Sequence, residues 1–384
     1  MASVYLTDLG IINCLGSSKT EIWENTVNGS QEKLLKNSII RGKEIYTGTI
    51  TDKLPKIKDR IYNCRTNQVL LHCFHQIEDS WIKISSKHAS RRIGIIVSSN
   101  NVGMDEARKH LADGASIGLS DLKLIESGVC AEFLQSITRV DGPCYGISTA
   151  CSSGAKSFSS AINLIKHDIC DAVLVGGADD IGMWSVYGFD SLNSISKGKT
   201  NPFSVNRDGI NLGEGGAIFI MEKDCEGVQV CGIGESSDAY HVTSPDPSGY
   251  GAFLAMKGAL EDANLRPEEI DYINLHGTGT VQNDEMEAKA VRELFGDKVL
   301  CSSSKALTGH LLGAAGSVEA GLCWLMLSEF NKNNDVIPHI YDGCDMPQPI
   351  SLVKKGTHKK ITYCLSNSFA FGGSNASVIL KNAH

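Results

Sequence analysis

The sequence predicts an α/β protein whose helices are sandwiched between two β-sheets. Short apolar runs rich in β-branched residues, at 91–99 and 171–179, alternate with segments of helical periodicity, as in α/β folds with largely parallel sheets. The helical segments near Cys151 and His310 are rich in alanine, glycine and serine and have little polar face. We therefore expect both helices to be buried on all sides.

The predicted elements alternate along the chain. The helix after Cys151 carries apolar residues at three- and four-residue spacing: Ala155, Phe158, Ile162 and Ile165. Downstream we expect helix 251–265, strand 269–276, helix 284–296 closed by Gly296, strand 298–304, helix 309–330, and two strands around a glycine turn within 359–381. A polar break at 221–227 divides the chain into an N-terminal half, 1–224, and a C-terminal half, 225–384.

Composition excludes several classes of protein. The 384 residues are 42% hydrophobic and 21% charged, which is typical of a globular protein with a large core. The formal net charge of −8 disfavours a general nucleic-acid binder, because phosphates require a basic surface. No apolar run approaches the roughly 20 residues of a membrane span, and the start lacks the zones of a signal peptide, so we expect a cytoplasmic protein.

The 13 cysteines show neither paired CxxC spacing nor a zinc-site pattern. Most are expected to be small buried hydrophobic residues, and neither disulfides nor a bound metal is predicted. No phosphate-cradling glycine loop lies between a strand and a helix, so no nucleotide cofactor is expected either.

Cys151 stands out in "STACSSG", residues 148–154. A thiol at a helix N-terminus feels the positive end of the helix dipole, which lowers its pKa and favours the nucleophilic thiolate. Its small neighbours leave room for a substrate carbonyl to approach the sulfur. A buried structural cysteine is the alternative interpretation.

His276, in "NLHGTGTVQND", and His310, in "KALTGHLLGAAG", lie at strand-to-helix junctions flanked by glycine. Layered α/β proteins place their sites at such junctions, although an isolated histidine is more often structural. A cysteine with distant histidines is typical of acyl transfer on a thiol.

The stretch "SNSFAFGGSN", residues 366–375, predicts a tight turn with an aromatic ring in it. The backbone N–H of Phe371, together with that of Cys151, could form an oxyanion hole. The alternative is a simple turn between two strands.

These motifs, in this order and over nearly the whole chain, resemble the elongating β-ketoacyl-acyl-carrier-protein synthases of fatty acid and polyketide assembly. The resemblance implies a thiolase-like fold of two similar halves in five layers, αβαβα, in an obligate dimer. It also implies that Cys151 takes the acyl chain from a carrier-protein thioester. His276 and His310 would then hold the carbonyl of the malonyl extender during decarboxylation.

The same resemblance implies further roles. Lys305 and Glu319 match the supporting pair that orders the histidines, and Phe371 matches the gating phenylalanine. Ala370 stands where housekeeping synthases usually have glycine, and a methyl group there would restrict gate motion. Asn211 replaces a usual aliphatic residue.

These departures, with "PHIYDG" at 338–343, look closest to the ketosynthases of bacterial aryl polyene clusters. That likeness implies a heterodimer with a chain-length-factor-like partner, with a homodimer as the alternative. The acidic acyl carrier protein would be guided by local basic residues, for which the candidates are Lys58, Arg60, Arg65 and Arg207.

Other interpretations stay open. One is a housekeeping elongation enzyme of fatty acid synthesis. Another is a non-catalytic chain-length factor, against which Cys151 argues, since such subunits lack the nucleophile. His310 disfavours an initiating ketosynthase with Cys-His-Asn or a thiolase, and a thiol hydrolase would leave the second histidine unexplained.

Overall fold

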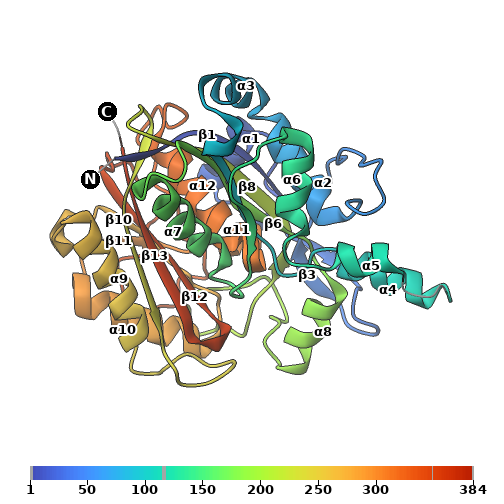
Figure 1. Ribbon diagram of the computed structural model, residues 1–384. Helices are drawn as coiled ribbons and strands as arrows, with labels where there is room; N and C mark the ends of the chain where they lie inside the picture. The colour runs from blue at the N-terminus through green and yellow to red at the C-terminus, as the bar shows by residue number, and fades with distance from the viewer. Residues whose placement is uncertain (1–2, 115–117, 348, 383–384) are drawn as a thin grey trace.

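The computed structural model describes residues 3–114, 118–347 and 349–382. Its main feature is ten strands hydrogen-bonded in one continuous order, which form two five-stranded sheets joined where one edge strand of each pairs with the other (Figure 1). The N-terminal sheet has the order β5-β4-β6-β8-β1, with bounds Cys144–Ile147, Ile93–Ser98, Ala172–Asp179, Gly215–Lys223 and Val4–Asn13. The C-terminal sheet has the order β11-β10-β12-β13-β9, with bounds Leu300–Ser302, Tyr272–Asn274, Tyr363–Ala370, Ser374–Lys381 and Val228–Ser237.

The two sheets repeat one topology. In each, the second strand in chain order lies parallel to the third and fourth, and the fifth lies antiparallel to the fourth and the first. One strand in each half, β8 or β13, therefore runs antiparallel to the other four, so the sheets are mixed where largely parallel sheets were predicted. For β12 and β13 the reason is local, because the short turn η5 (Phe371–Gly373) can join only antiparallel strands.

The helices and the two sheets form five layers, as in the predicted αβαβα fold. Helices α7 (Ser153–Lys166) and α12 (Ala315–Leu327) form the middle layer, and each contacts strands of both sheets. The outer face of the N-terminal sheet is covered by α2 (Arg65–His75) and α6 (Val129–Thr138). The outer face of the C-terminal sheet is covered by α9 (Tyr250–Ala263), against which α10 (Val281–Phe295) packs. The layered α/β fold is confirmed.

Small residues let the two middle helices approach closely. A Cβ atom on Gly154 would lie 2.5 Å from the backbone nitrogen of Ser317, and one on Gly316 would lie 2.7 Å from that of Ala155. Every residue of α12 is buried, which confirms the expectation from its apolar composition. The Ala/Gly/Ser-rich pattern is thus explained by helix contact across the molecular centre.

Smaller elements surround this framework. A three-stranded sheet is formed by β2 (Leu35–Asn37), β3 (Ile45–Gly48) and β7 (Leu212–Gly213). The remaining helices are α1 (Lys19–Asn28), α3 (Glu78–Lys87), α4 (Met104–Ala112), α5 (Leu119–Leu124), α8 (Met183–Ser191) and α11 (Lys305–Thr308). Figure 1 shows α4 and α5 projecting from the body of the protein. Within the described ranges, no helix combines the length and apolar character that a membrane crossing requires.

Candidate active site

Cys151 lies between β5 and α7, two residues before the helix begins. Ala150 directly before it adopts the left-handed conformation, with φ of 52°, which is uncommon for a residue with a side chain and recurs at functional sites. The thiol is 6% exposed, and burial raises its pKa to about 12. The expectation of a lowered pKa is wrong for this state, because removal of water disfavours the thiolate more than Lys305 and the nearby backbone favour it.

His276 follows β10 and is fixed by a buried carboxylate on α10. The backbone N–H groups of His276 and Gly277 each donate to Glu287, both at 2.8 Å. The Lys305 ammonium donates to the His276 carbonyl at 2.5 Å and lies 3.4 Å from Nδ1. Burial, with the Lys305 charge second, holds the pKa of His276 well below its ordinary value. The ring is therefore neutral, and a proton on Nε2 fits a lysine donor at Nδ1.

His310 lies between α11 and α12. We expected it at the start of a long helix, but α12 begins only at Ala315. The backbone turns first at Gly309 (φ 72°) and again at Leu312 (φ 52°), so an irregular loop at 309–311 leads through the 3-10 turn η4 (Leu312–Ala314) into α12. The His310 N–H donates to the Asn211 carbonyl at 2.7 Å, and the Gly213 N–H donates to the His310 carbonyl at 2.9 Å. Burial lowers the pKa of this imidazole well below its ordinary value as well.

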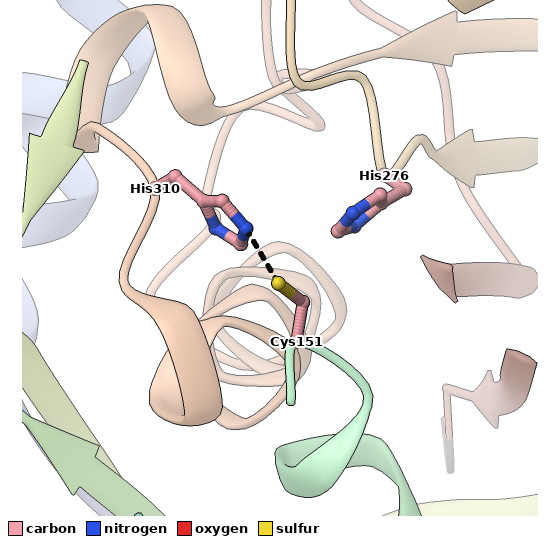
Figure 2. A group of neighbouring side chains, drawn as sticks. All are labelled: Cys151, His276 and His310. Atoms are coloured by element: carbon pink, nitrogen blue, oxygen red, sulfur yellow. Dashed lines mark hydrogen bonds between the residues drawn. The ribbon is translucent and has the colours of Figure 1, made fainter. Parts of the chain in front are cut away.

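The three side chains converge from separate elements (Figure 2). Cys151 Sγ lies 2.9 Å from His310 Nε2, and the centroids of the two imidazole rings are 5.4 Å apart. One donor atom from each residue falls within 4.8 Å of the others, a spacing that a metal ion could also use. A neutral thiol facing a neutral imidazole is also an arrangement for proton transfer from sulfur to nitrogen.

Lys305 and Glu319 form a buried ion pair behind His276, with side chains 1% and 4% exposed. Burial raises the pKa of Glu319 to about 6, and the lysine charge opposes that shift. The lysine therefore links the carboxylate on α12 to the backbone and ring of His276. This geometry suits the predicted orienting role.

Phe371 covers one side of the catalytic cavity. The cavity, of about 70 Å³, is lined by Cys151, both histidines and Phe371. The Phe371 ring is 37% exposed and contacts Phe189 of α8, with centroids 5.5 Å apart. Ala370 has extended backbone, with φ of −110°, so its methyl group causes no strain in this conformation. The oxyanion hole formed by the Cys151 and Phe371 amides stays a prediction.

Two important carboxylates escaped the sequence prediction. Glu287, which fixes the His276 loop, is fully buried, and burial raises its pKa to about 7. Asp179, at the end of β6, accepts hydrogen bonds from Gly313 and from the loop at 99–101. The sequence could have indicated Asp179, because it is an acidic residue at the end of a buried strand. No local pattern indicated that Glu287 contacts the backbone of the His276 loop.

The basic candidates for carrier-protein contact divide into two groups. Lys58 and Arg60 are exposed. Arg65 instead donates two hydrogen bonds to Glu214. Arg207 is 8% exposed and donates to the Ser204 carbonyl and to Glu285. Arg207 is therefore poorly placed as a carrier-protein contact, because its guanidinium is buried and already paired with Glu285 and, at 3.9 Å, with Asp284.

The layered fold and the buried thiol with two imidazoles define a thiolase-like condensing enzyme, which is an acyltransferase. Profiles of the beta-ketoacyl synthase N-terminal and C-terminal domains match residues 2–225 and 228–338. The chain belongs to the β-ketoacyl synthase family.

Similar proteins cover the whole chain. The ketosynthase ApeO of Xenorhabdus doucetiae, solved in complex with its chain length factor ApeC, is 35% identical with a TM-score of 0.91 over 100% of this chain and 98% of that one. A beta-ketoacyl synthase of Burkholderia phymatum is 25% identical, with a TM-score of 0.86 over 100% of both chains. A 3-oxoacyl-[acyl-carrier-protein] synthase 2 of Staphylococcus aureus is 29% identical over 98% of each sequence.

Proposed function

We propose that this protein elongates an acyl chain by decarboxylative Claisen condensation with malonyl-acyl-carrier protein. The observation that carries the proposal is the distance of 2.9 Å between Cys151 Sγ and His310 Nε2, in a cavity that His276 also lines. The nucleophile Cys151, the proton acceptor His310 and the second imidazole of His276 thus line one buried cavity.

In the first step His310 Nε2 takes the thiol proton as Cys151 sulfur bonds to the acyl carbonyl of the incoming thioester. The bond from that carbonyl to the carrier thiol breaks, and the leaving thiolate regains the proton from His310. This exchange overcomes the raised pKa of Cys151, because the thiolate is formed only as the new bond forms.

In the second step malonyl thioester replaces the departed carrier, and its terminal carbon–carbon bond breaks to release carbon dioxide. The electron pair becomes an enolate, whose oxygen accepts hydrogen bonds from His276 Nε2–H and from the Nε2–H tautomer of His310. A neutral donor stabilises this developing charge more than it stabilises the neutral carbonyl. The enolate carbon then attacks the acyl-Cys151 carbonyl, and the sulfur leaves and is reprotonated from solvent.

The acyl chains are proposed to belong to aryl polyene or related polyene synthesis. Support comes from the 35% identity to ApeO over the full chain and from Ala370 in the gate segment. Housekeeping fatty acid elongation is the second candidate, favoured by the 29% identity to the staphylococcal synthase. The chain needs no bound cofactor for this reaction, and we propose that it acts in the cytoplasm.

A chain-length-factor-like subunit is the proposed partner. Strand β5 ends the sheet order, and on its outer side no strand of the described chain pairs with it. Tyr145 on this strand is 37% exposed. An unpaired edge with exposed aromatic surface suits pairing with a second, similar subunit. ApeO, which is solved with such a factor, supports a heterodimer over a homodimer.

The test is intact-protein mass spectrometry after the chain is mixed with acyl-carrier protein, alone and coexpressed with a chain-length-factor-like partner. We expect one acyl group on Cys151 and elongated product once malonyl-carrier protein is added. Native mass spectrometry of the same samples reports the assembly. A stable, fully active homodimer would contradict the heterodimer, and absence of any acyl adduct would contradict the condensation itself.

A further inference from the structure

His339 is a buried histidine that none of the proposed reaction steps uses. Its side chain is 4% exposed, and it lies outside the lining of the catalytic cavity. It belongs to the stretch "PHIYDG" at 338–343, between α12 and β12. A buried polar side chain requires hydrogen-bond partners, so the partners of this ring show what it holds in place.

Both ring nitrogens of His339 have backbone partners. The Ser303 N–H donates to Nδ1 at 3.1 Å, and Nε2–H donates to the Pro202 carbonyl at 2.9 Å. A backbone N–H can only donate and a carbonyl can only accept, so this pairing requires the neutral ring with its proton on Nε2. Burial lowers the pKa of His339 to about 4, so the ring keeps this form at neutral pH.

The two segments that His339 joins both contact the His276 loop. Ser303 Oγ donates to the Gly277 carbonyl at 2.6 Å. Phe203, which follows Pro202, packs against the same glycine, where a Cβ atom would lie 2.9 Å from the phenylalanine ring. The His339 ring also contacts Phe203, with ring centroids 5.9 Å apart. His339 therefore supports this loop by two routes.

Ser303 also supports the lysine behind His276. Its hydroxyl accepts the Lys305 N–H at 3.2 Å, and the Lys305 ammonium donates to the His276 carbonyl at 2.5 Å. Glu287 fixes N–H groups of the His276 loop, whereas Ser303 fixes a carbonyl of that loop. Loss of the His339 ring would free Ser303 to shift, and the imidazole of His276 would shift with it.

We propose that His339 is a positioning residue for malonyl decarboxylation. By fixing Ser303 and the segment at 202–203, it holds the His276 imidazole where the ring can donate to the enolate oxygen. This inference rests on the proposed function, because it assigns His339 to the step in which His276 acts. Cys151 and His310 lie on other elements, so acylation should be nearly independent of His339.

The test measures decarboxylation and acylation separately in the full chain, coexpressed with its partner subunit. His339→Leu leaves the Ser303 N–H and the Pro202 carbonyl without partners. The kcat for carbon dioxide release from malonyl-acyl-carrier protein should fall about 10- to 100-fold, as for lost orienting contacts at other sites. The KM for that substrate and the single-turnover rate of Cys151 acylation should stay within about twofold, because His339 does not line the cavity.

Two conservative variants separate the two hydrogen bonds. In His339→Asn the amide oxygen takes the place of Nδ1 and can accept the Ser303 N–H. In His339→Gln the longer side chain puts its amide nearer the place of Nε2 and the Pro202 carbonyl. The asparagine variant should therefore decarboxylate about two- to tenfold faster than the glutamine variant, which is the value of one neutral hydrogen bond. This comparison decides the matter if His339→Leu does not fold.

His75→Leu is the matched control, because His75 is exposed at the end of α2 and its replacement should change neither rate. Decarboxylation in His339→Leu equal to that in His75→Leu would overturn the proposal. Equal falls in acylation and decarboxylation would do the same, because they indicate a purely structural role, and so would equal rates in the asparagine and glutamine variants. Absence of decarboxylation in the wild-type protein would instead contradict the condensation itself.

Discussion

The two halves of the chain share one strand order but carry different chemistry. Cys151 follows β5, the third strand of the N-terminal sheet, and precedes the middle helix α7. His310 follows β11, the third strand of the C-terminal sheet, and precedes the middle helix α12. The nucleophile and its proton acceptor thus occupy equivalent positions, and the contact of α7 with α12 brings them together.

The loops that follow the second strand of each sheet, β4 and β10, also differ in the residues they carry. After β10 the C-terminal half places His276, held by Glu287. After β4 the N-terminal half places residues 99–101, held by Asp179, with no imidazole among them. Both loops are fixed by buried carboxylates that accept backbone N–H groups. The difference teaches that the repeated framework supplies rigid loops, whereas the residue at each loop supplies the reaction.

The largest expected effect is the loss of acylation when the nucleophile of the N-terminal half is removed. Cys151→Ala removes the nucleophile, so acylation should be abolished while some malonyl decarboxylation remains on the intact histidine side. Intact-protein mass spectrometry and carbon dioxide release measure the two steps. If the variant loses both activities equally, the division of roles between the halves is wrong.

The converse change is His276→Ala. Removal of one donor to the enolate oxygen should slow decarboxylation about 10²- to 10³-fold, while acylation of Cys151 continues. His310→Ala should also impair decarboxylation and still permit acylation, at a slower rate, because the ring faces the sulfur at 2.9 Å. For each variant, the measurement is the ratio of the single-turnover rate of acylation to the rate of decarboxylation. A fall in acylation alone in His276→Ala would contradict the assignment.

Substitutions in the Lys305–Glu319 ion pair test whether that pair positions His276 for decarboxylation. Lys305→Met leaves Glu319 unpaired and should lower the free energy of unfolding by about 3–5 kcal/mol. The double variant Lys305→Met/Glu319→Leu should regain that stability in urea titrations. Its decarboxylation rate should nevertheless stay about 10- to 100-fold low, as for lost orienting contacts at other sites. Recovery of activity with stability would make the pair purely structural.

The pH dependence of thiol reactivity tests the environment of the N-terminal loop. Burial raises the pKa of Cys151 from 9.0 to about 12, so the thiolate is scarce at neutral pH and its fraction increases as pH rises. Alkylation by iodoacetamide should therefore increase about tenfold per pH unit from pH 7 to 10, without a plateau. Peptide mass spectrometry follows Cys151, with exposed Cys344 as the reference for reagent reactivity. A plateau below pH 8.5 would instead indicate a thiolate–imidazolium pair.

The smallest effect concerns the contact that joins the halves. Gly154→Ala places a methyl group against α12 and should lower the free energy of unfolding by about 1–3 kcal/mol. Gly258→Ala, on the outer helix α9, is the matched control, because its Cβ would lie at an ordinary 3.4 Å from the nearest atom. There the better helix propensity of alanine should raise stability by about 0.5–1 kcal/mol. Equal effects in urea titrations would contradict a tight contact between α7 and α12 at Gly154.

Local patterns predicted part of this molecule well. The periodicity of residues 153–166 and the apolar run at 172–179 became α7 and β6, because both depend on neighbours close in the chain. The start of α12 was misplaced, since Gly309 and Leu312 turn the backbone in a way that hydrophobic pattern does not record. Arg207 was a candidate for carrier-protein contact but is buried, because it pairs with Glu285, which is distant in sequence and becomes its neighbour only after folding.

Motif order and apolar spacing are properties of the chain, so they suffice to predict most helices and strands, the family and the residue types of the site. Tertiary structure decided their chemical state. Removal of water around Cys151, His276 and His310 sets each in its neutral form, and distant carboxylates fix the loops that carry them. Desolvation and contacts between remote segments depend on how the whole protein packs, so no short stretch of sequence encodes them.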